Sequence, residues 1–167
     1  MVSRPAAWLL LAAALLAAPA LAQERPDPAL SPGEARTTDL VVICGTSTRE
    51  FRHTTEAMKR RVYRAYGLSG PHTGYCSIGV RGCEVDHLIS LELGGADTEK
   101  NLWPQSYSPA FKWNAVVKDR LENETHRRVC DEAVGIEVRQ RLLLEYQERI
   151  AADWVSLYVE VFGGAPD

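Results

Sequence analysis

The first candidate for chemistry is the pair Asp86-His87, which is followed by Gly94-Gly95 and by Asn101-Leu102. Histidine exchanges a proton near neutral pH, so it suits acid or base catalysis. Carboxylate and amide oxygens are the ligands that a hard divalent cation such as Mg²⁺ prefers. An isolated Asp-His pair is commonly only a surface acid beside a strand histidine. Its significance therefore depends on the motifs that accompany it in this order.

These motifs, placed before a predicted helix that carries Asn114, resemble the HNH endonuclease family of the His-Me finger or ββα-metal class. The resemblance covers about residues 83–118. It implies an α+β fold, in which a ββα-metal finger of hairpin, Gly-Gly loop and helix is embedded in a mainly helical single domain. It also implies hydrolysis of phosphodiester bonds in DNA or RNA. Ser90 departs from the family, which often has proline there.

The resemblance implies a role for each polar side chain of these motifs. His87 would be the general base that activates water, and Asn101 would orient it. Asp86 and Asn114 would bind a divalent metal ion, either Mg²⁺, Mn²⁺ or another divalent ion, which neutralises charge on the phosphate and the leaving oxygen. If the register of the helix differs, the second ligand would instead be one of Asn101, Asp119 and His126.

The charge pattern limits how the chain could bind a nucleic acid. The formal net charge is −3 at pH 7, so a nucleic-acid partner requires a local basic patch. Residues 49–64 carry a net charge of +4. Arg60 and Arg64 on the predicted helix there, and Lys118 four residues after Asn114, would hold substrate phosphates. The alternative is a solvated helix face without a ligand.

The N-terminus predicts export. A short positive start, the apolar stretch Ala6–Ala18 and the small-residue end at Ala22 are typical of a secretory signal peptide over residues 1–22. Three prolines and a glycine among polar residues predict a flexible leader over residues 23–38. One domain is expected over residues 39–167. The protein would then be periplasmic or secreted, with no membrane attachment. No protein partner follows from the sequence.

The four cysteines are consistent with export, because exported proteins form disulfides. Three connectivities are possible for two disulfides, and we favour Cys76 with Cys83 and Cys44 with Cys130. The competing interpretation is a structural zinc site, but the chain has no Cys-x-x-Cys pair.

Hydrophobic periodicity and turn residues predict the elements that must position these groups. The predicted strands are Leu40–Cys44, Tyr75–Val80 and Cys83–Ser90, the last two forming a hairpin. The predicted helices are Thr54–Tyr66, Pro109–Arg128 and Ile136–Phe162, of which the last is one helix or two. The segment Pro104–Pro109 is expected to be irregular.

Two hypotheses for function remain. The first is a metal-dependent HNH-type endonuclease with His87 as its base. The second is a non-catalytic, exported binding module that keeps the same fold and its disulfides. They differ on metal, because only the nuclease should gain stability from a divalent cation held by Asp86.

Overall fold

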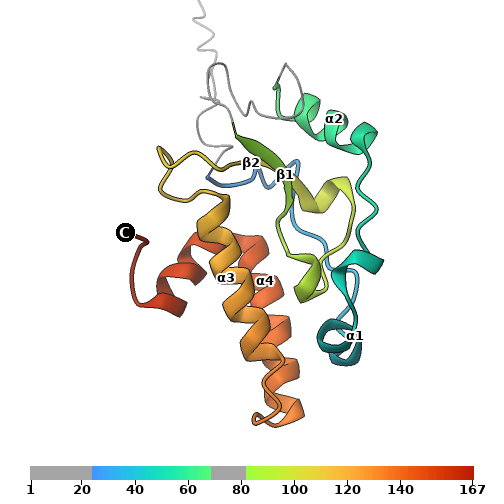
Figure 1. The fold of residues 1–167 in the computed structure, drawn as a ribbon, viewed down its shortest axis with the longest axis vertical. Helices are drawn as coiled ribbons and strands as arrows, with labels where there is room; N and C mark the ends of the chain where they lie inside the picture. Colours follow the sequence, from blue (N-terminus) through green and yellow to red (C-terminus); the bar gives the residue numbers. More distant parts are fainter. Residues whose placement is uncertain (1–23, 69–81) are drawn as a thin grey trace, which may run out of the picture.

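The computed structural model describes residues 24–68 and 82–167, which combine helices with one small antiparallel sheet (Figure 1). This mixed α and β architecture agrees with the sequence prediction. In chain order the elements are α1 (Leu40–Gly45), the 3₁₀ turn η2 (Thr48–Glu50), α2 (Glu56–Ala65), β1 (Cys83–His87), the 3₁₀ turns η3 (Leu91–Leu93) and η4 (Glu99–Asn101), β2 (Leu102–Ser106), α3 (Ala115–Val129) and α4 (Ile136–Phe162).

Strands β1 and β2 pair in an antiparallel register that sets the geometry of the site. Asp86 lies opposite Trp103, and His87 lies opposite Leu102 at the end of the strand. Successive side chains of a strand point to opposite faces of the sheet. Asp86 and His87 therefore point away from each other, although they are adjacent in the sequence.

The partner of β1 differs in part from the predicted hairpin. The predicted strand Tyr75–Val80 lies outside the described residues, so its pairing stays a prediction. The predicted strand Cys83–Ser90 corresponds to β1, which ends at His87 rather than at Ser90. Its partner is β2, over Leu102–Ser106. The prediction that Pro104–Pro109 is irregular is wrong for its first residues. Within residues 24–68 and 82–167 the sheet has two strands. A strand with one paired neighbour tolerates a proline, because its other side needs no ladder hydrogen bond.

Helices α3 and α4 lie side by side and form a hairpin, and α2 contacts both strands of the sheet (Figure 1). Buried Trp103 of β2 joins their apolar side chains in one core. The start of α3 is later than predicted, at Ala115 rather than near Pro109, because Asn114 caps it. No helix in residues 24–68 and 82–167 is long and apolar enough to span a bilayer.

The segment Leu40–Cys44 forms the helix α1 and not the predicted strand. The Asp39 side chain caps the helix by accepting a hydrogen bond from the backbone nitrogen of Val41 at 2.8 Å. Leu40 and Ile43, three residues apart, are both buried, whereas Val41 is exposed. Burial of two side chains at helical spacing thus outweighs the β-branched composition of the run.

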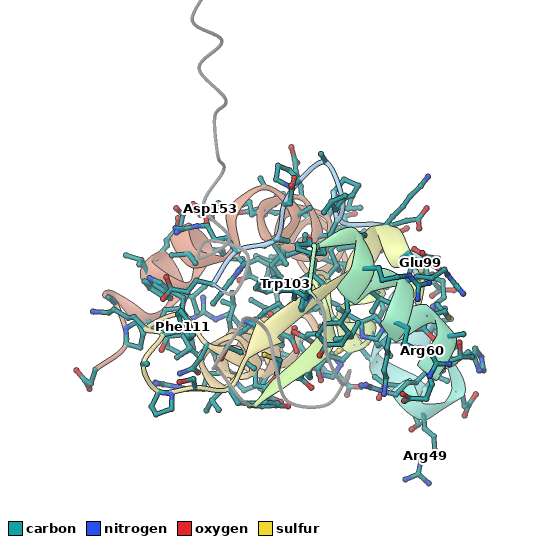
Figure 2. The ribbon with its side chains drawn as sticks, turned by 90° about the horizontal axis from the view of Figure 1, so that it is seen from above. Arg49, Arg60, Glu99, Trp103, Phe111 and Asp153 are labelled. Carbon is teal, nitrogen blue, oxygen red and sulfur yellow. A yellow bond between two sulfur atoms is a disulfide. The ribbon has the colours of Figure 1, made fainter. Side chains whose placement is uncertain are left out.

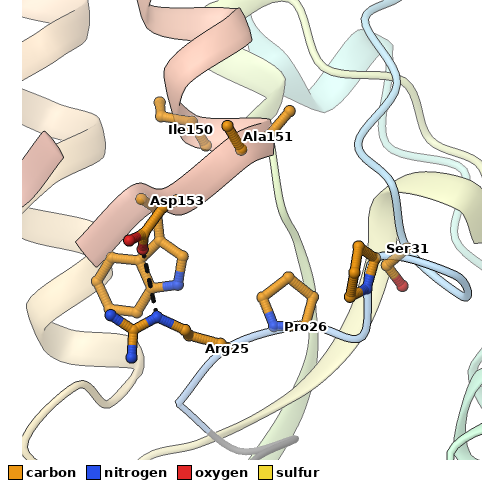
Figure 3. Close-up of a pocket in the computed structure, with 9 residues that line it drawn as sticks. Arg25, Pro26, Ser31, Ile150, Ala151 and Asp153 are labelled. Carbon is orange, nitrogen blue, oxygen red and sulfur yellow. Dashed lines mark hydrogen bonds and ion pairs between the residues drawn. The ribbon is translucent and has the colours of Figure 1, made fainter. Parts of the chain in front are cut away.

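The N-terminal segment 24–38 packs along the domain, in contrast to the predicted flexible leader. Ala35 forms a β-bridge with Gly95, and the Ser31 hydroxyl donates to the backbone oxygen of Leu102. At the other end, Arg25 pairs with Asp153 at 3.3 Å beside a small pocket (Figure 3). Asp153 has a non-helical backbone that divides α4 into two helical segments, one of the two alternatives expected there.

The disulfide Cys44–Cys130 ties α1 to the end of α3, and this confirms one of the two predicted pairings. It closes a loop with a sequence separation of 86 residues. Cross-links that close long loops restrict the unfolded chain strongly. Cys76 lies outside the described residues, so the pairing of Cys76 with Cys83 stays a prediction.

Helix α2 confirms the predicted helix over Thr54–Tyr66. The Thr55 side chain caps its N-terminus by accepting a hydrogen bond from the backbone nitrogen of Met58 at 3.2 Å. Val62 and Tyr63 are buried, so this face holds α2 on the domain while the opposite face is exposed.

Replacing Thr55 by alanine should lower the free energy of unfolding by about 1 kcal/mol, because the cap loses its acceptor. Urea denaturation followed by circular dichroism measures this change. Thr55→Ser is the matched control, since serine keeps the hydroxyl and should retain most of the stability. Equal midpoints for the alanine and serine variants would contradict the capping role.

Candidate functional site

His87 ends β1, and its side chain points to the face of the sheet opposite Asp86. The residue is only 3% exposed. Its Nε2 atom lies 2.7 Å from Oδ1 of Asp97, which belongs to the loop between β1 and β2. A histidine held against a carboxylate in this way has a fixed ring orientation, as a general base requires.

Asp97 is itself held by the segment that leads into α2. Its carboxylate accepts hydrogen bonds from the backbone nitrogen of His53 and from the Thr54 hydroxyl. Burial would raise the pKa of Asp97, but the hydrogen bonds from Thr54, His87 and His53 outweigh it and hold the pKa below its ordinary value. The carboxylate is therefore ionised at neutral pH. Nε2 of His87 must then carry the hydrogen, which leaves Nδ1 of the neutral ring to accept a proton.

The His87 ring is neutral near pH 7. Burial is the main cause that lowers its pKa below the ordinary value, and Asp97 and Asp86 oppose this effect only in part. The positive charge of Arg52 lowers the pKa further, which places this exposed cation within electrostatic range of the ring. A neutral imidazole beside a cation can take a proton from a water molecule while the cation attracts a phosphate.

Asn101 shapes the loop next to His87. Its Oδ1 accepts from the backbone nitrogen of Ile89 at 2.9 Å, and its Nδ2 donates to the backbone oxygens of Ile89 and Ala96 at 2.9 and 2.8 Å. Its Oδ1 also accepts from the backbone nitrogen of Glu34. Asp97 therefore contacts the ring and Asn101 contacts the backbone, whereas the sequence predicts that Asn101 orients the base.

The Gly-Gly segment is required by the close turn of this loop. A Cβ atom at Gly95 would lie 1.9 Å from the backbone oxygen of Ile89, much closer than a non-bonded carbon atom can approach. Gly94 has a φ of +79°, which favours glycine. The loop can therefore fold tightly back on the end of β1 and present Asp97 to His87.

On the other face of the sheet, Asp86 is paired with Lys118 of α3. The Lys118 Nζ atom lies 2.8 Å from Oδ2 of Asp86 and 2.6 Å from the backbone oxygen of His87, and it also contacts Glu122. Burial alone would lower the pKa of Lys118, but Asp86 and Glu122 raise it above its ordinary value. The lysine is charged and only 1% exposed. Its ammonium group contacts Asp86 and Glu122 and does not face solvent, so its predicted role at a substrate phosphate stays a prediction.

The predicted second ligand, Asn114, is used as the cap of α3. Its Oδ1 accepts from the backbone nitrogen of Val117 at 3.2 Å, and its Nδ2 donates to the backbone oxygen of Phe111 at 3.0 Å. Its amide oxygen thus has an internal partner, as Asp86 has in Lys118. The pair Asp86 and Asn114 does not fit a divalent cation.

The alternative ligands do not complete such a site. His126 lies near the far end of α3, with its Nε2 3.4 Å from Sγ of Cys130. The pKa of Asp119 is raised by burial and then by the charge of Asp86, so these two carboxylates are close enough to repel. Among the residues that the structure describes, no group of three or more histidine, cysteine, aspartate or glutamate side chains could hold a metal ion.

Helix α2 follows the segment that holds Asp97, and Arg60 and Arg64 form its basic face. Arg60 and Arg64 are exposed, and Figure 2 shows Arg60 pointing outward on the side of the molecule that also carries Arg49. Arg61 pairs with Glu99 at 2.6 Å and so fixes α2 to η4. Arg60 and Arg64 are thus where the sequence predicts them, on a solvent-facing surface.

The sequence alone did not identify Asp97. It lies ten residues after His87, in a loop with several polar residues, and only the tight Gly-Gly turn brings it to the ring. An acidic residue just after a Gly-Gly segment was the one available signal. Comparison of the chain with protein-family models, curated proteins and solved structures finds no match.

Proposed function

We propose that this protein is an exported HNH-type endonuclease that hydrolyses phosphodiester bonds of a nucleic acid, with His87 as the general base. The observation that carries the proposal is the buried contact between His87 and the ionised Asp97 at the end of β1. The order of β1, the Gly-Gly loop, β2 and α3 is the order of a ββα finger. The disulfide Cys44–Cys130 supports an oxidising location, in the periplasm or outside the cell.

The chemistry of the proposal follows from the ring geometry. Nδ1 of His87 takes a proton from a water molecule as the water attacks phosphorus in line with the leaving oxygen. The bond between phosphorus and the leaving oxygen breaks as the new P–O bond forms, and the leaving oxygen takes a proton from solvent. Asp97 stabilises the imidazolium that forms, and Arg52 attracts the phosphate. No step is assigned to a metal, since Asp86 and Asn114 do not fit one.

Cleavage of supercoiled plasmid DNA by the purified, disulfide-bonded protein tests the proposal. The assay compares Mg²⁺, Mn²⁺ and EDTA, and it repeats each condition with RNA. We expect nicking by the wild-type protein and none by His87→Ala. His53→Ala is the matched control, because it removes an exposed imidazole but keeps the backbone nitrogen that donates to Asp97. Absence of cleavage in every condition would refute the proposal.

The basic face of α2 should contribute affinity that depends on salt. Removing both charges with Arg60→Ala/Arg64→Ala should reduce the slope of log K against log salt concentration by about 2, since each phosphate contact contributes about 0.9. Fluorescence anisotropy of a labelled duplex, measured in the His87→Ala background to prevent cleavage, gives the slope. Arg141→Ala, an exposed arginine of α4, is the control. An unchanged slope in the double variant would exclude α2 from the interface.

The second candidate function is a non-catalytic binding module. The observation that favours it is that both predicted metal ligands already have internal partners, Lys118 for Asp86 and Val117 for Asn114. Such a module would bind nucleic acid through α2 with the same salt dependence. It would leave plasmid intact in all conditions, so the cleavage assay separates the two functions.

A further inference from the structure

Three oxygen atoms from two elements converge on one point at the end of β1. They are Oδ2 of Asp86, the backbone oxygen of His87 and Oε1 of Glu122. Two carboxylates and a carbonyl are the donor set that a hard cation takes in proteins. The cation at this point is the ammonium group of Lys118, which lies 2.8 Å from Asp86 and 2.6 Å from the His87 oxygen.

The charge of this cluster explains why a cation is needed there. Lys118 is almost completely buried, and Glu122 is also buried. Burial raises the pKa of Glu122 to about 8, and the positive charge of Lys118 opposes this rise and favours the carboxylate. Buried carboxylates without a positive partner are strongly destabilising. The three hydrogens of the ammonium group match the three acceptors, so the group is fully satisfied. A divalent ion on the same oxygens would lie within contact distance of the ammonium and would be repelled by it.

We propose that Lys118 is the built-in cation of this site, and that the free wild-type protein binds no divalent metal ion at Asp86. This proposal rests on the proposed function in one respect: the nuclease family is the reason to expect a metal ion at Asp86. Lys118 is then a positioning residue. It anchors the backbone of His87 through the carbonyl oxygen, and it holds the end of β1 against α3 without contacting substrate.

We expect that a divalent ion can take the place of the Lys118 ammonium group when the lysine is removed. Lys118→Ala leaves three oxygens and a small space in place of the ammonium, which is a ligand set that a divalent ion can fill. The variant should therefore gain a cation site that the wild-type protein lacks. Its stability should then depend on the divalent ion concentration by linkage.

Mn²⁺ titration followed by electron paramagnetic resonance, together with thermal unfolding, tests this prediction without any activity measurement. For the wild-type protein we expect the same Mn²⁺ signal as for Asp86→Asn and no change of Tm with Mg²⁺ or Mn²⁺. For Lys118→Ala we expect a lower Tm that rises by about 8 °C at an ion concentration of ~100 times Kd. The response should vanish in Lys118→Ala/Asp86→Asn.

Mn²⁺ binding to the wild-type protein that is lost in Asp86→Asn would overturn the proposal. A folded Lys118→Ala variant that gains no response would overturn the claim that the three oxygens form a cation site. If Lys118→Ala does not fold, the comparison of wild type with Asp86→Asn decides alone. These outcomes are independent of the plasmid assay, so a protein without nuclease activity can still confirm the role of Lys118.

Discussion

Replacing Asp97 by asparagine should lower the rate of phosphodiester cleavage by about 10²- to 10⁴-fold, because it inverts the tautomer of the base. The backbone nitrogen of His53 and the His87 ring contact different oxygens of Asp97. In the variant, the amide oxygen will face the His53 nitrogen, which can only donate. The amide nitrogen will then face Nε2 of His87 and donate to it. The ring hydrogen moves to Nδ1, which can no longer accept a proton from water.

The pH dependence of the rate gives this prediction a direction. In the wild-type protein burial lowers the pKa of His87, so the acid limb of kcat/KM should lie below the ordinary histidine pKa of about 6.5. Asp97 raises the pKa of His87 against that trend. Its replacement by a neutral amide should therefore move the acid limb to still lower pH. The maximal value of kcat/KM should also be much smaller than in the wild-type protein.

Rates measured across the pH range with a fluorogenic oligonucleotide, or with plasmid if the oligonucleotide is not cleaved, provide the comparison. Asp39→Asn is the matched control. Residue 39 caps α1 and does not contact His87, and asparagine caps a helix about as well as aspartate. Thermal unfolding of both variants separates a loss of rate from a loss of fold. An Asp97→Asn variant that is folded and as active as the control would exclude Asp97 from the mechanism.

The elements that could be predicted are those whose local signals agree with their tertiary contacts. In α2, the capping Thr55 and the apolar residues at helical spacing both indicate the helix that forms. In α1 the β-branched residues favour a strand, while the Asp39 cap and the buried positions favour a helix, and burial decides. Strand β2 contains Pro104 and exists only because β1 lies beside it. No local signal in the sequence carries that information.

The sequence predicts which residue types form the candidate site, but it does not predict which side chains contact one another there. The sequence identifies His87, but the partner of its ring depends on a turn that brings Asp97 back over the strand end. Side chains alternate along β1, so Asp86 and His87 lie on opposite faces of the sheet. Their adjacency in the sequence does not indicate this separation. Lys118 contacts the end of β1, whereas the sequence predicts that it holds a substrate phosphate. Its burial against Asp86 follows from where Asn114 starts α3, a boundary that periodicity does not fix.

Removing the Asn101 side chain should mainly destabilise the protein and leave the pKa of the base unchanged. Asn101 is completely buried, and its amide group satisfies the backbone nitrogen and oxygen of Ile89 and the backbone oxygen of Ala96. Asn101→Ala leaves these buried groups without partners. Each unsatisfied group costs about 1–3 kcal/mol, so we expect a loss of about 4 kcal/mol in the free energy of unfolding. That loss is a large fraction of the stability of a typical domain.

Urea denaturation measures this loss, and Asn123→Ala is the control. Asn123 is exposed on α3 and donates to the backbone oxygen of Asp119, so its removal should change stability by no more than about 0.5 kcal/mol. At a temperature where Asn101→Ala remains folded, its rate should show the wild-type acid limb, because the ring of His87 is still held by Asp97. The opposite pattern, wild-type stability with a displaced acid limb, would mean that Asn101 and not Asp97 orients the base.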